Sequence, residues 1–320
     1  MAYSVVYWNR ATDDVYEVIR SQMPPDWKLI TLEGEGKDGW RRQLRDAEFM
    51  IIADWPLTGE DLAAAPKLRM VQHQGVGHER IDKEALKARG IPLGLCPAGT
   101  TIGVAEHTLL LILAVYRRLV VADTKLRQGT WLQWGLRSTS FELAGKTLGL
   151  VGFGRIGQAV AKRAHAFEVQ ILYHDAFLPA PPPAAAAWGA QSVGLEELLR
   201  RSDIVSVHVP TTGETRRFMN AAKFARMKRS AIFINTSRGA VVNEPDLVQA
   251  LRDKVIAGAG LDVFEQEPIN PDNPLLGLDT VVLTPHIAAG TVDALRQKMA
   301  SVFANLQRCA RGEAIQDRVV

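Results

Sequence analysis

The stretch Lys146-Thr-Leu-Gly-Leu-Val-Gly-Phe-Gly-Arg-Ile-Gly157 decides the fold of this 320-residue chain. Its apolar part, Thr147 to Val151, predicts a buried strand. Residues 155–167 then space small and apolar side chains as a helix that packs on a sheet would. The turn between them has the GxGxxG spacing of a pyrophosphate-binding loop. In such a loop, Gly152 would make the tight turn, Gly154 would let the ligand approach the backbone, and Gly157 would let the helix pack closely on the strand.

The context of this motif favours a dinucleotide-binding loop over a plain strand–turn–helix unit with a surface Asp. The helix N-terminus offers the free N–H groups of Arg155 and Ile156, and its positive dipole end, to phosphates. A second apolar strand, Val169 to Tyr173, follows, and Asp175 stands at its end, 18 residues after the last glycine. A carboxylate there accepts hydrogen bonds from the adenosine ribose and repels a 2′-phosphate. The sequence therefore predicts NAD in preference to NADP, and leaves open whether Arg155 or His174 weakens that preference.

The composition is that of a globular protein, with 47% hydrophobic and 23% charged residues. A net charge of +3, from 38 basic and 35 acidic residues, is too balanced to indicate a nucleic-acid partner. Cys96 and Cys309 cannot form a disulfide framework, and neither has a Cys/His cluster of metal-ligand spacing around it. The N-terminus lacks the order of a signal peptide, and the most apolar run, Thr108 to Val115, is too short to span a bilayer. We therefore expect a cytoplasmic protein with no metal site and no membrane partner.

The first hundred residues show their own alternation of strands and helices. Helical patterns such as Asp13–Gln22 and Lys83–Arg89 separate apolar segments that predict strands, at residues 4–8, 28–32, 49–53, 68–72 and 92–95. Five strands separated by helices indicate a small parallel α/β domain, and ligands bind such sheets beyond the carboxyl ends of the strands. Gly75 and Gly77 follow the fourth strand, where they either offer backbone N–H groups to an anion or form a turn only.

From residue 146 onward the alternation is more regular. Six apolar segments predict the strands of a doubly wound dinucleotide-binding sheet, at residues 147–151, 169–173, 204–209, 231–235, 256–261 and 280–283. Residues 179–187 are low in complexity and predict a surface loop. Long helices are predicted at 104–119 and 292–311. We expect a dinucleotide-binding domain over residues 99–289 and a substrate domain over 1–98, completed by 290–320.

Three predicted strands in the second half end in loops that each carry a reactive residue. The loops are Asn235-Thr-Ser-Arg238, Asp262-Val-Phe-Glu-Gln-Glu267 and Thr284-Pro-His286. Each reactive residue alone has a structural explanation: a surface cation, an acid at a helix start, a polar residue packed in a loop. In a parallel sheet, however, all three loops open on the edge of the phosphate loop, which places an Arg, a Glu and a His near the nicotinamide end of a dinucleotide.

With these motifs in place, the chain resembles the D-isomer-specific 2-hydroxyacid dehydrogenase family, which includes glycerate, glyoxylate/hydroxypyruvate and phosphoglycerate dehydrogenases. The resemblance runs from about Val71 to Ala289. It rests on the glycine motif described above and on six further motifs, which are Gly75-Val-Gly77, Val104-Ala-Glu-His107, Val207-His-Val-Pro-Thr-Thr-Gly-Glu-Thr215, Ile234-Asn-Thr-Ser-Arg-Gly-Ala-Val-Val-Asn243, Gly260-Leu-Asp-Val-Phe-Glu-Gln-Glu-Pro268 and Thr284-Pro-His-Ile-Ala288. It implies an α/β fold of two doubly wound parallel-sheet domains, with a Rossmann NAD-binding domain inserted into a flavodoxin-like substrate domain.

The resemblance also implies the roles of the three reactive residues. Arg238 would bind the substrate carboxylate and polarise its 2-oxo group, for which a planar fork of donors is suited. His286 would donate a proton to the carbonyl oxygen as hydride arrives, and accept it in the oxidation direction. Glu267 would hydrogen-bond the imidazole, fix its tautomer and raise its pKa.

Other contacts are implied in the same way. The backbone of Val76 and Gly77 would bind the carboxylate from the first domain, so that the site lies between two lobes. On the cofactor, Thr236 and Asp262 would contact the nicotinamide side, and Pro210 and Thr215 would line the adenosine and phosphate side.

One departure from the family pattern lies beside the substrate loop. After Gly77 the family commonly has Asp or Tyr, Asp-Asn and Ile-Asp, whereas this chain has His78-Glu-Arg80-Ile-Asp82. We expect His78 or Arg80 to tune which acid is accepted, while the reaction type is unaffected. Trp134 and Arg137 are candidates to cap the cleft.

The sequence thus favours an NAD-dependent dehydrogenase of D-2-hydroxy acids, or reductase of small 2-oxo acids such as glyoxylate or hydroxypyruvate. The resemblance further implies a homodimer in which the helix near residues 104–119 packs against a partner. Two alternatives remain: an NAD-sensing corepressor-like module, because the family includes one, and a phosphite- or formate-type oxidant. Formate users of this fold lack the Glu267–His286 pairing, which argues against that branch.

Overall fold

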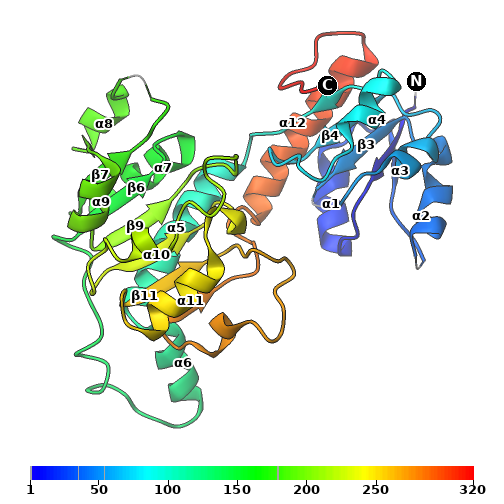
Figure 1. Ribbon diagram of the computed structural model, residues 1–320. Coiled ribbons are helices and arrows are strands. Elements are labelled where there is room, and N and C mark those ends of the chain that lie inside the picture. The colour runs from blue at the N-terminus through cyan, green and yellow to red at the C-terminus, as the bar shows by residue number, and fades with distance from the viewer. Residues whose placement is uncertain (1, 35, 54, 179) are drawn as a thin grey trace. The chain divides into compact units, whose positions relative to one another are not determined.

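The computed structural model describes residues 2–34, 36–53, 55–178 and 180–320 (Figure 1). The chain forms two compact units. Unit 1 comprises Met1–Thr100 and Thr291–Val320, and unit 2 comprises Thr101–Gly290. Each unit is built around a sheet whose strands all pair in parallel, so unit 2 is a parallel α/β domain inserted into the chain of another.

The sheet of unit 1 has the strand order β2-β1-β3-β4-β5. This is the flavodoxin-like order, which reverses direction between β1 and β3. All five predicted strands are present, with ends shifted by two residues or fewer: β1 Ser4–Tyr7, β2 Lys28–Ile30, β3 Phe49–Ile52, β4 Met70–His73 and β5 Leu93–Gly94.

Helices cover both faces of this sheet. On one face, α1 (Asp13–Gln22) and the C-terminal α12 (Val292–Ala310) bury side chains such as Ile19 and Phe303 against the strands. On the other face lie α2 (Lys37–Gln43), the short 3₁₀ helix η1 (Leu44–Asp46), α3 (Gly59–Ala63) and α4 (Lys83–Ala88). Because every strand is sandwiched in this way, the strands appear in the sequence as nearly continuous apolar runs.

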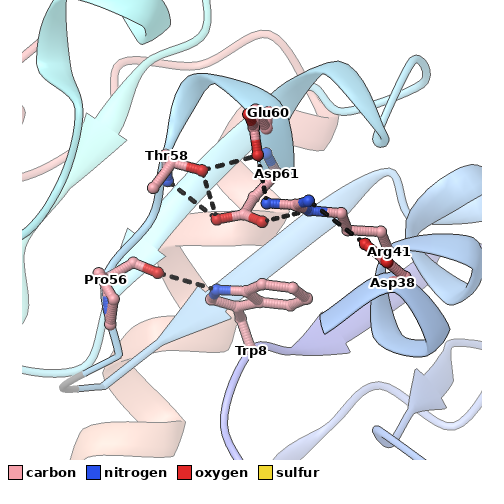
Figure 2. Close-up of polar contacts among 7 residues, drawn as sticks. All are labelled: Trp8, Asp38, Arg41, Pro56, Thr58, Glu60 and Asp61. Carbon is pink, nitrogen blue, oxygen red and sulfur yellow. Dashed lines mark hydrogen bonds and ion pairs between the residues drawn. The ribbon is translucent and has the colours of Figure 1, made fainter. Parts of the chain in front are cut away.

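A polar network joins α2 to α3 in unit 1 (Figure 2). Asp61 is fully buried and accepts a hydrogen bond from Arg41 Nε at 2.8 Å, while Thr58 and Asp61 form a capping box at the start of α3. Burial alone would raise the pKa of the Asp61 carboxyl, but the hydrogen bonds from Arg41 and Thr58 outweigh it and lower the pKa. Arg41 Nη2 also donates to Glu60 at 2.8 Å. The network therefore fixes the position of α2 on the sheet.

The sheet of unit 2 has the order β12-β11-β10-β9-β6-β7-β8, the Rossmann order with a seventh strand at one edge. Its strands are β6 Thr147–Val151, β7 Gln170–His174, β8 Gln191–Ser192, β9 Ile204–Val207, β10 Ile232–Asn235, β11 Gly258–Leu261 and β12 Val281–Leu283. The expectation of six strands was wrong by one, because β8 consists of two exposed polar residues and has no apolar run to reveal it.

Two groups of helices cover this sheet (Figure 1). On one face lie α5 (Thr100–Tyr116), α7 (Arg155–Ala164) and α8 (Pro183–Ala187), which share a core with β6 and β7. On the other face lie α9 (Leu195–Arg201), α10 (Ala221–Phe224) and α11 (Glu244–Arg252). Short 3₁₀ helices complete the unit at η2 His165–Phe167, η3 Gly239–Val241 and η4 Pro274–Gly277.

Three predicted segments differ from the structure. The helix expected over 104–119 ends at Tyr116, because Arg118 adopts a left-handed conformation with φ 52°, and α6 (Leu119–Arg127) begins after it. The helix expected over 155–167 becomes a 3₁₀ turn after Ala164. The segment expected as a surface loop contains α8, since a proline at its start and a run of alanines favour a helix; Pro179 itself lies outside the described residues.

Both cysteines are free, Cys96 buried and Cys309 partly so. In the part of the chain that the structure describes, no helix combines the length and the apolar character needed to cross a bilayer.

Candidate active site

The glycine loop between β6 and α7 has the geometry that its sequence predicts. Gly152 has φ 93°, a conformation that L-residues rarely adopt, and a Cβ at this position would meet the His208 carbonyl oxygen at 2.6 Å. A Cβ at Gly157 would meet the Gly152 oxygen at 2.3 Å. Around Gly154, in contrast, a Cβ would meet no described atom within 4 Å. Two glycines thus serve the turn and its packing, and the third leaves open space at the helix N-terminus, where a pyrophosphate would fit.

Asp175 lies just beyond β7 and is tied to this loop. Its Oδ2 accepts a hydrogen bond from the backbone N–H of Phe153 at 2.8 Å, and its Oδ1 accepts one from Phe177 at 2.9 Å. The carboxylate is partly exposed, and each of its oxygens keeps a further lone pair for a ligand. The residues present therefore suit a dinucleotide.

Arg238 lies in the loop that follows β10. Asn235, the last residue of that strand, shapes the loop: its Oδ1 accepts from the Ser237 N–H at 2.9 Å and its Nδ2 donates to the Arg238 carbonyl oxygen at 3.0 Å. Arg238 Nη1 donates to the Ser237 carbonyl oxygen at 2.7 Å. The sequence did not mark Asn235 as a site residue, although Asn at a strand end is a common turn former.

His286 lies in the loop that follows β12, with φ 54°. Its Nδ1 lies 2.8 Å from Glu267 Oε2, and Glu267 Oε1 also accepts from the Phe264 N–H at 3.1 Å. The hydrogen bond from Glu267 raises the pKa of His286; partial burial and the positive charge of Arg238 oppose this, while the charges of Glu267 and Asp262 add to it. Glu267 therefore stabilises the imidazolium, and the charge of Arg238 lies near enough to act on it.

The loops that carry Arg238 and Glu267 touch through their backbones. A Cβ at Gly239 would fall 1.8 Å from the Phe264 carbonyl oxygen, closer than any side chain permits. β10, β11 and β12 are neighbours in parallel register, so their carboxyl ends lie on one edge of the sheet. The structure thus brings Arg238, Glu267 and His286 together at this edge, as the strand pattern predicts.

Asp262 follows β11 and is fully buried. Its carboxylate accepts hydrogen bonds from the Thr284 hydroxyl at 2.6 Å, the Ile287 N–H at 2.9 Å and the Ala288 N–H at 2.8 Å. Its backbone oxygen accepts from the His286 N–H at 2.8 Å. The resemblance implies that Asp262 contacts the nicotinamide; the structure shows that it organises the loop of His286.

The other predicted cofactor residues lie along the same edge. Thr236 follows β10, and its Oγ1 lies 3.0 Å from Thr108 Oγ1 on α5. In the loop after β9, Thr215 Oγ1 donates to the Pro210 carbonyl oxygen at 2.5 Å and accepts from the Thr212 N–H at 2.7 Å. These two hydrogen bonds close the loop where the adenosine side of a dinucleotide is predicted.

Val76 and Gly77 belong to unit 1, in the loop after β4. The Gly75 N–H donates to the ring of His73 at 2.8 Å, and Val76 is 43% exposed. Burial lowers the pKa of His73, which favours the neutral ring that can accept this hydrogen bond. Beside the loop, Lys83 Nζ lies 3.4 Å from His78 Nδ1, so the departure from the family pattern contains a paired histidine.

A doubly wound sheet with a glycine loop and a histidine–carboxylate pair on one edge is the fold and site of a dinucleotide-dependent oxidoreductase. Comparison with known proteins narrows this class. The family model for "D-isomer specific 2-hydroxyacid dehydrogenase, NAD binding domain" matches residues 109–288, which lie within unit 2. The chain belongs to the D-isomer specific 2-hydroxyacid dehydrogenase family, and the resemblance seen in the sequence is confirmed.

Individual relatives agree with this family. The chain is 44% identical over 271 residues to the glyoxylate reductase of Korarchaeum cryptofilum, with 84% of this chain and 80% of the relative aligned. It is 37% identical to the D-3-phosphoglycerate dehydrogenase of Archaeoglobus fulgidus, with 90% of this chain but 55% of the relative aligned. The crystal structure of apo D-lactate dehydrogenase from Escherichia coli matches with a TM-score of 0.88 at 27% identity, over 99% of this chain and all of the other. The protein is an enzyme of this family, and its cofactor is a nicotinamide dinucleotide.

Proposed function

We propose that the enzyme transfers a hydride between NAD(H) and a small D-2-hydroxy acid or 2-oxo acid, with glyoxylate or hydroxypyruvate as the oxo acid. The observation that carries this proposal is the 2.8 Å contact between His286 Nδ1 and Glu267 Oε2. A carboxylate on Nδ1 fixes the imidazole tautomer and leaves Nε2 to exchange a proton with a substrate oxygen. The His286 side chain is 50% exposed.

The chain's own residues account for the proton transfer and for substrate binding. The nicotinamide, when bound, supplies or accepts the hydride. In the reduction direction, His286 carries the proton on Nε2 and donates it to the carbonyl oxygen, while Glu267 stabilises the charged ring. We assign Arg238 to the substrate carboxylate. Within the described residues, its guanidinium donates to protein only through Nη1, which supports this role because its other N–H groups can form a bidentate pair.

The remaining substrate and cofactor contacts are part of the same proposal. We assign the backbone of Val76 and Gly77 to the substrate carboxylate. Thr236 and Asp262 are assigned to the nicotinamide side, and the loop of Pro210 and Thr215 to the adenosine side. With these roles, unit 1 is the substrate domain and unit 2 the dinucleotide-binding domain.

The size of the substrate is inferred from the relatives. Those aligned over most of their length carry the name glyoxylate reductase, whereas the phosphoglycerate dehydrogenase from Archaeoglobus is nearly twice as long as its aligned part. This supports glyoxylate or hydroxypyruvate over a phosphorylated acid.

We propose NAD in preference to NADP because of Asp175. Its carboxylate would meet a 2′-phosphate with like charge. The variant Asp175→Asn keeps an oxygen acceptor for the Phe153 N–H and removes the charge, so it separates the electrostatic role from the structural one. We expect the ratio of kcat/KM with NADH to kcat/KM with NADPH to fall by about tenfold or more, because the repulsion between the carboxylate and the 2′-phosphate is removed. An unchanged ratio would refute this role.

We also propose a homodimer in the cytoplasm. In unit 2, α5, α6 and the segment that follows expose large apolar side chains: Leu110, Leu119, Val120, Leu126, Trp131 and Trp134 are each at least half exposed. Exposed apolar side chains on neighbouring segments favour a protein partner, and two copies of the chain would cover each other. Light scattering of the purified protein measures the mass: a monomer at micromolar concentration would contradict the dimer.

The test of the activity is NADH oxidation, followed at the nicotinamide absorbance band, with glyoxylate, hydroxypyruvate, pyruvate and larger 2-oxo acids. We expect turnover with at least one small acid, and a fall of about 100-fold or more in His286→Ala while NADH affinity is retained. His165→Ala is the matched control, because His165 is exposed at the end of α7. NADH binding without turnover of any acid would instead favour the NAD-sensing module. Oxidation of phosphite or formate would favour the phosphite- or formate-type oxidant.

A further inference from the structure

A chain of hydrogen bonds runs from helix α5 to the loop that carries His286. His107, on α5, places its Nε2 2.8 Å from Thr284 Oγ1, and Thr284 Oγ1 lies 2.6 Å from Asp262 Oδ1. The side chains of His107 and Asp262 are 10% and 0% exposed. All of these residues belong to unit 2. The contact is therefore internal to this unit, shielded from water, and joins residues 177 positions apart in the sequence.

The direction of each hydrogen bond follows from the donors available. The Thr284 hydroxyl has one proton, and its closest acceptor is the carboxylate oxygen of Asp262, so the hydroxyl donates to Asp262. Its oxygen is then an acceptor for His107, and His107 must carry a proton on Nε2. The chain thus runs from the imidazole through the hydroxyl to the carboxylate, and His107 Nε2 also lies 3.5 Å from Asp262 Oδ1.

The carboxylate at the end of this chain holds the backbone on which His286 stands. Asp262 Oδ1 and Oδ2 accept the N–H groups of Ile287 and Ala288, the two residues after His286. His286 itself has φ 54°, a left-handed conformation that costs free energy for a residue other than glycine. Such a conformation persists only where neighbouring groups enforce it. A displaced Asp262 carboxylate would release two of the hydrogen bonds that enforce it.

We infer that His107 and Thr284 are positioning residues for His286, which act through Asp262 and never touch the substrate. The inference rests on the proposed role of His286. It assigns a function in the reaction to the Val104-Ala-Glu-His107 motif and to the threonine of Thr284-Pro-His286.

The test compares paired substitutions. Thr284→Val keeps the shape and removes the hydroxyl, whereas Thr284→Ser keeps the hydroxyl; His107→Phe removes the Nε2 donor, whereas His107→Gln places an amide donor near it. We expect Thr284→Val and His107→Phe to lower kcat for 2-oxo acid reduction by about tenfold or more, because a shift of the order of 1 Å at a reacting group has large effects. KM for the 2-oxo acid should stay within about twofold. Thr284→Ser and His107→Gln should recover most of the rate.

The double variant His107→Phe/Thr284→Val decides whether the two residues act as one chain. If they do, the double variant is no slower than the slower single variant, since the connection is already broken. Effects on kcat that multiply would overturn the inference. Single variants that keep the wild-type kcat would also overturn the inference. The same holds for single variants whose rate falls only in proportion to the loss of folded protein, which circular dichroism measures. His165→Phe is the control for the loss of an exposed imidazole.

A second measurement does not depend on activity. Histidine ring signals followed by NMR across pH, with that of His286 identified from its absence in His286→Asn, report the pKa of His286 directly. Thr284→Val should lower that pKa toward the ordinary value, because the ring is no longer held against Glu267. An unchanged pKa would contradict the inference. If the wild-type enzyme were inactive with every acid and Thr284→Val still lowered the pKa of His286, the proposed function would be refuted. The positioning of His286 by Thr284 would still be supported.

Discussion

Gly239 and Phe264 touch backbone to backbone: a Cβ on Gly239 would lie 1.8 Å from the carbonyl oxygen of Phe264. Gly239 directly follows Arg238, and the N–H of Phe264 donates to Glu267. Together with the hydrogen bond from the Asp262 N–H to the Asn235 carbonyl oxygen, this contact between two main chains sets how far the guanidinium proposed to bind the substrate lies from the carboxylate that supports the proposed acid. Hydrogen bonds within each loop cannot set that distance, because they join residues of the same loop.

We accordingly expect Gly239→Ala to damage both the site and the fold. The added methyl group meets main-chain atoms, which cannot rotate away, so the two loops must separate. Overpacking of this kind typically costs about 1–3 kcal/mol of unfolding free energy, and a displacement near 1 Å costs about 100-fold in kcat/KM. Urea denaturation and steady-state kinetics measure the two effects.

Gly194→Ala provides the matched control. Gly194 has φ −64°, and a Cβ there would meet no described atom within 4 Å. Stability and activity should remain close to those of the wild type. If Gly239→Ala behaved like this control, the contact with Phe264 would not set the geometry of the site.

The glycine loop allows ligand binding to be separated from folding. Gly154→Val adds a side chain where no described atom lies within 4 Å, so the fold should be retained, while the space proposed for the pyrophosphate is filled. We expect NADH affinity to fall by about 100-fold or more, measured by quenching of protein fluorescence, with a melting temperature close to that of the wild type. Gly157→Ala should mainly lower the melting temperature, because its Cβ would meet the Gly152 oxygen at 2.3 Å. Tight NADH binding by a stable Gly154→Val protein would exclude this loop as the phosphate site.

The pair of Glu267 and His286 predicts a pH dependence. Glu267 raises the pKa of His286 above its ordinary value. Reduction needs the imidazolium, so its rate should be maximal below the raised pKa and decline as pH rises through it; oxidation needs the neutral ring and should show the reverse. Glu267→Gln removes the negative charge, and we expect the decline in reduction to move to lower pH. A profile that stayed in place would mean that another group carries the proton.

The strands and the edge of the site were predictable from the sequence because parallel strands buried on both faces are apolar throughout, and their carboxyl ends meet at one edge. Arg238, Glu267 and His286 could therefore be placed together from three strand ends. β8 has no apolar side chains and was missed, and the end of α5 was missed because the conformation of Arg118 leaves no pattern in the sequence.

Contacts between residues far apart in the chain could not be predicted in the same way. Asp262 was assigned to the cofactor by resemblance, yet its hydrogen bonds to Thr284, Ile287 and Ala288 depend on how β11 and β12 pair. The contact between His107 and Thr284 depends on how α5 crosses the sheet. The need for glycine at position 239 depends on the distance between two loops. Each is a property of packing, and no local pattern of residues encodes it.

The network around Asp61 makes a prediction for the stability of unit 1 (Figure 2). Asp61 is fully buried, and its pKa is lowered by the hydrogen bonds from Arg41 and Thr58, against the effect of burial. A group whose pKa is lower in the folded state stabilises that state above its unfolded pKa, near 3.9, and loses this contribution as pH falls. Asp61→Ala leaves the donors of Arg41 and Thr58 without their buried acceptor, so we expect a loss of about 3 kcal/mol at pH 7.

Urea denaturation at pH 7 and near pH 3 tests this prediction, with Asp38→Ala as the control. Asp38 also lies 3.5 Å from Arg41, but its side chain is 91% exposed, so water and salt screen the pair and its removal should change little. The difference between wild type and Asp61→Ala should be smaller at the acid pH, since the carboxyl of the unfolded wild type binds a proton there that the lowered pKa of the folded state disfavours. A difference that grew with acidity would show that Asp61 is more readily protonated in the folded state, and that its burial outweighs the hydrogen bonds from Arg41 and Thr58.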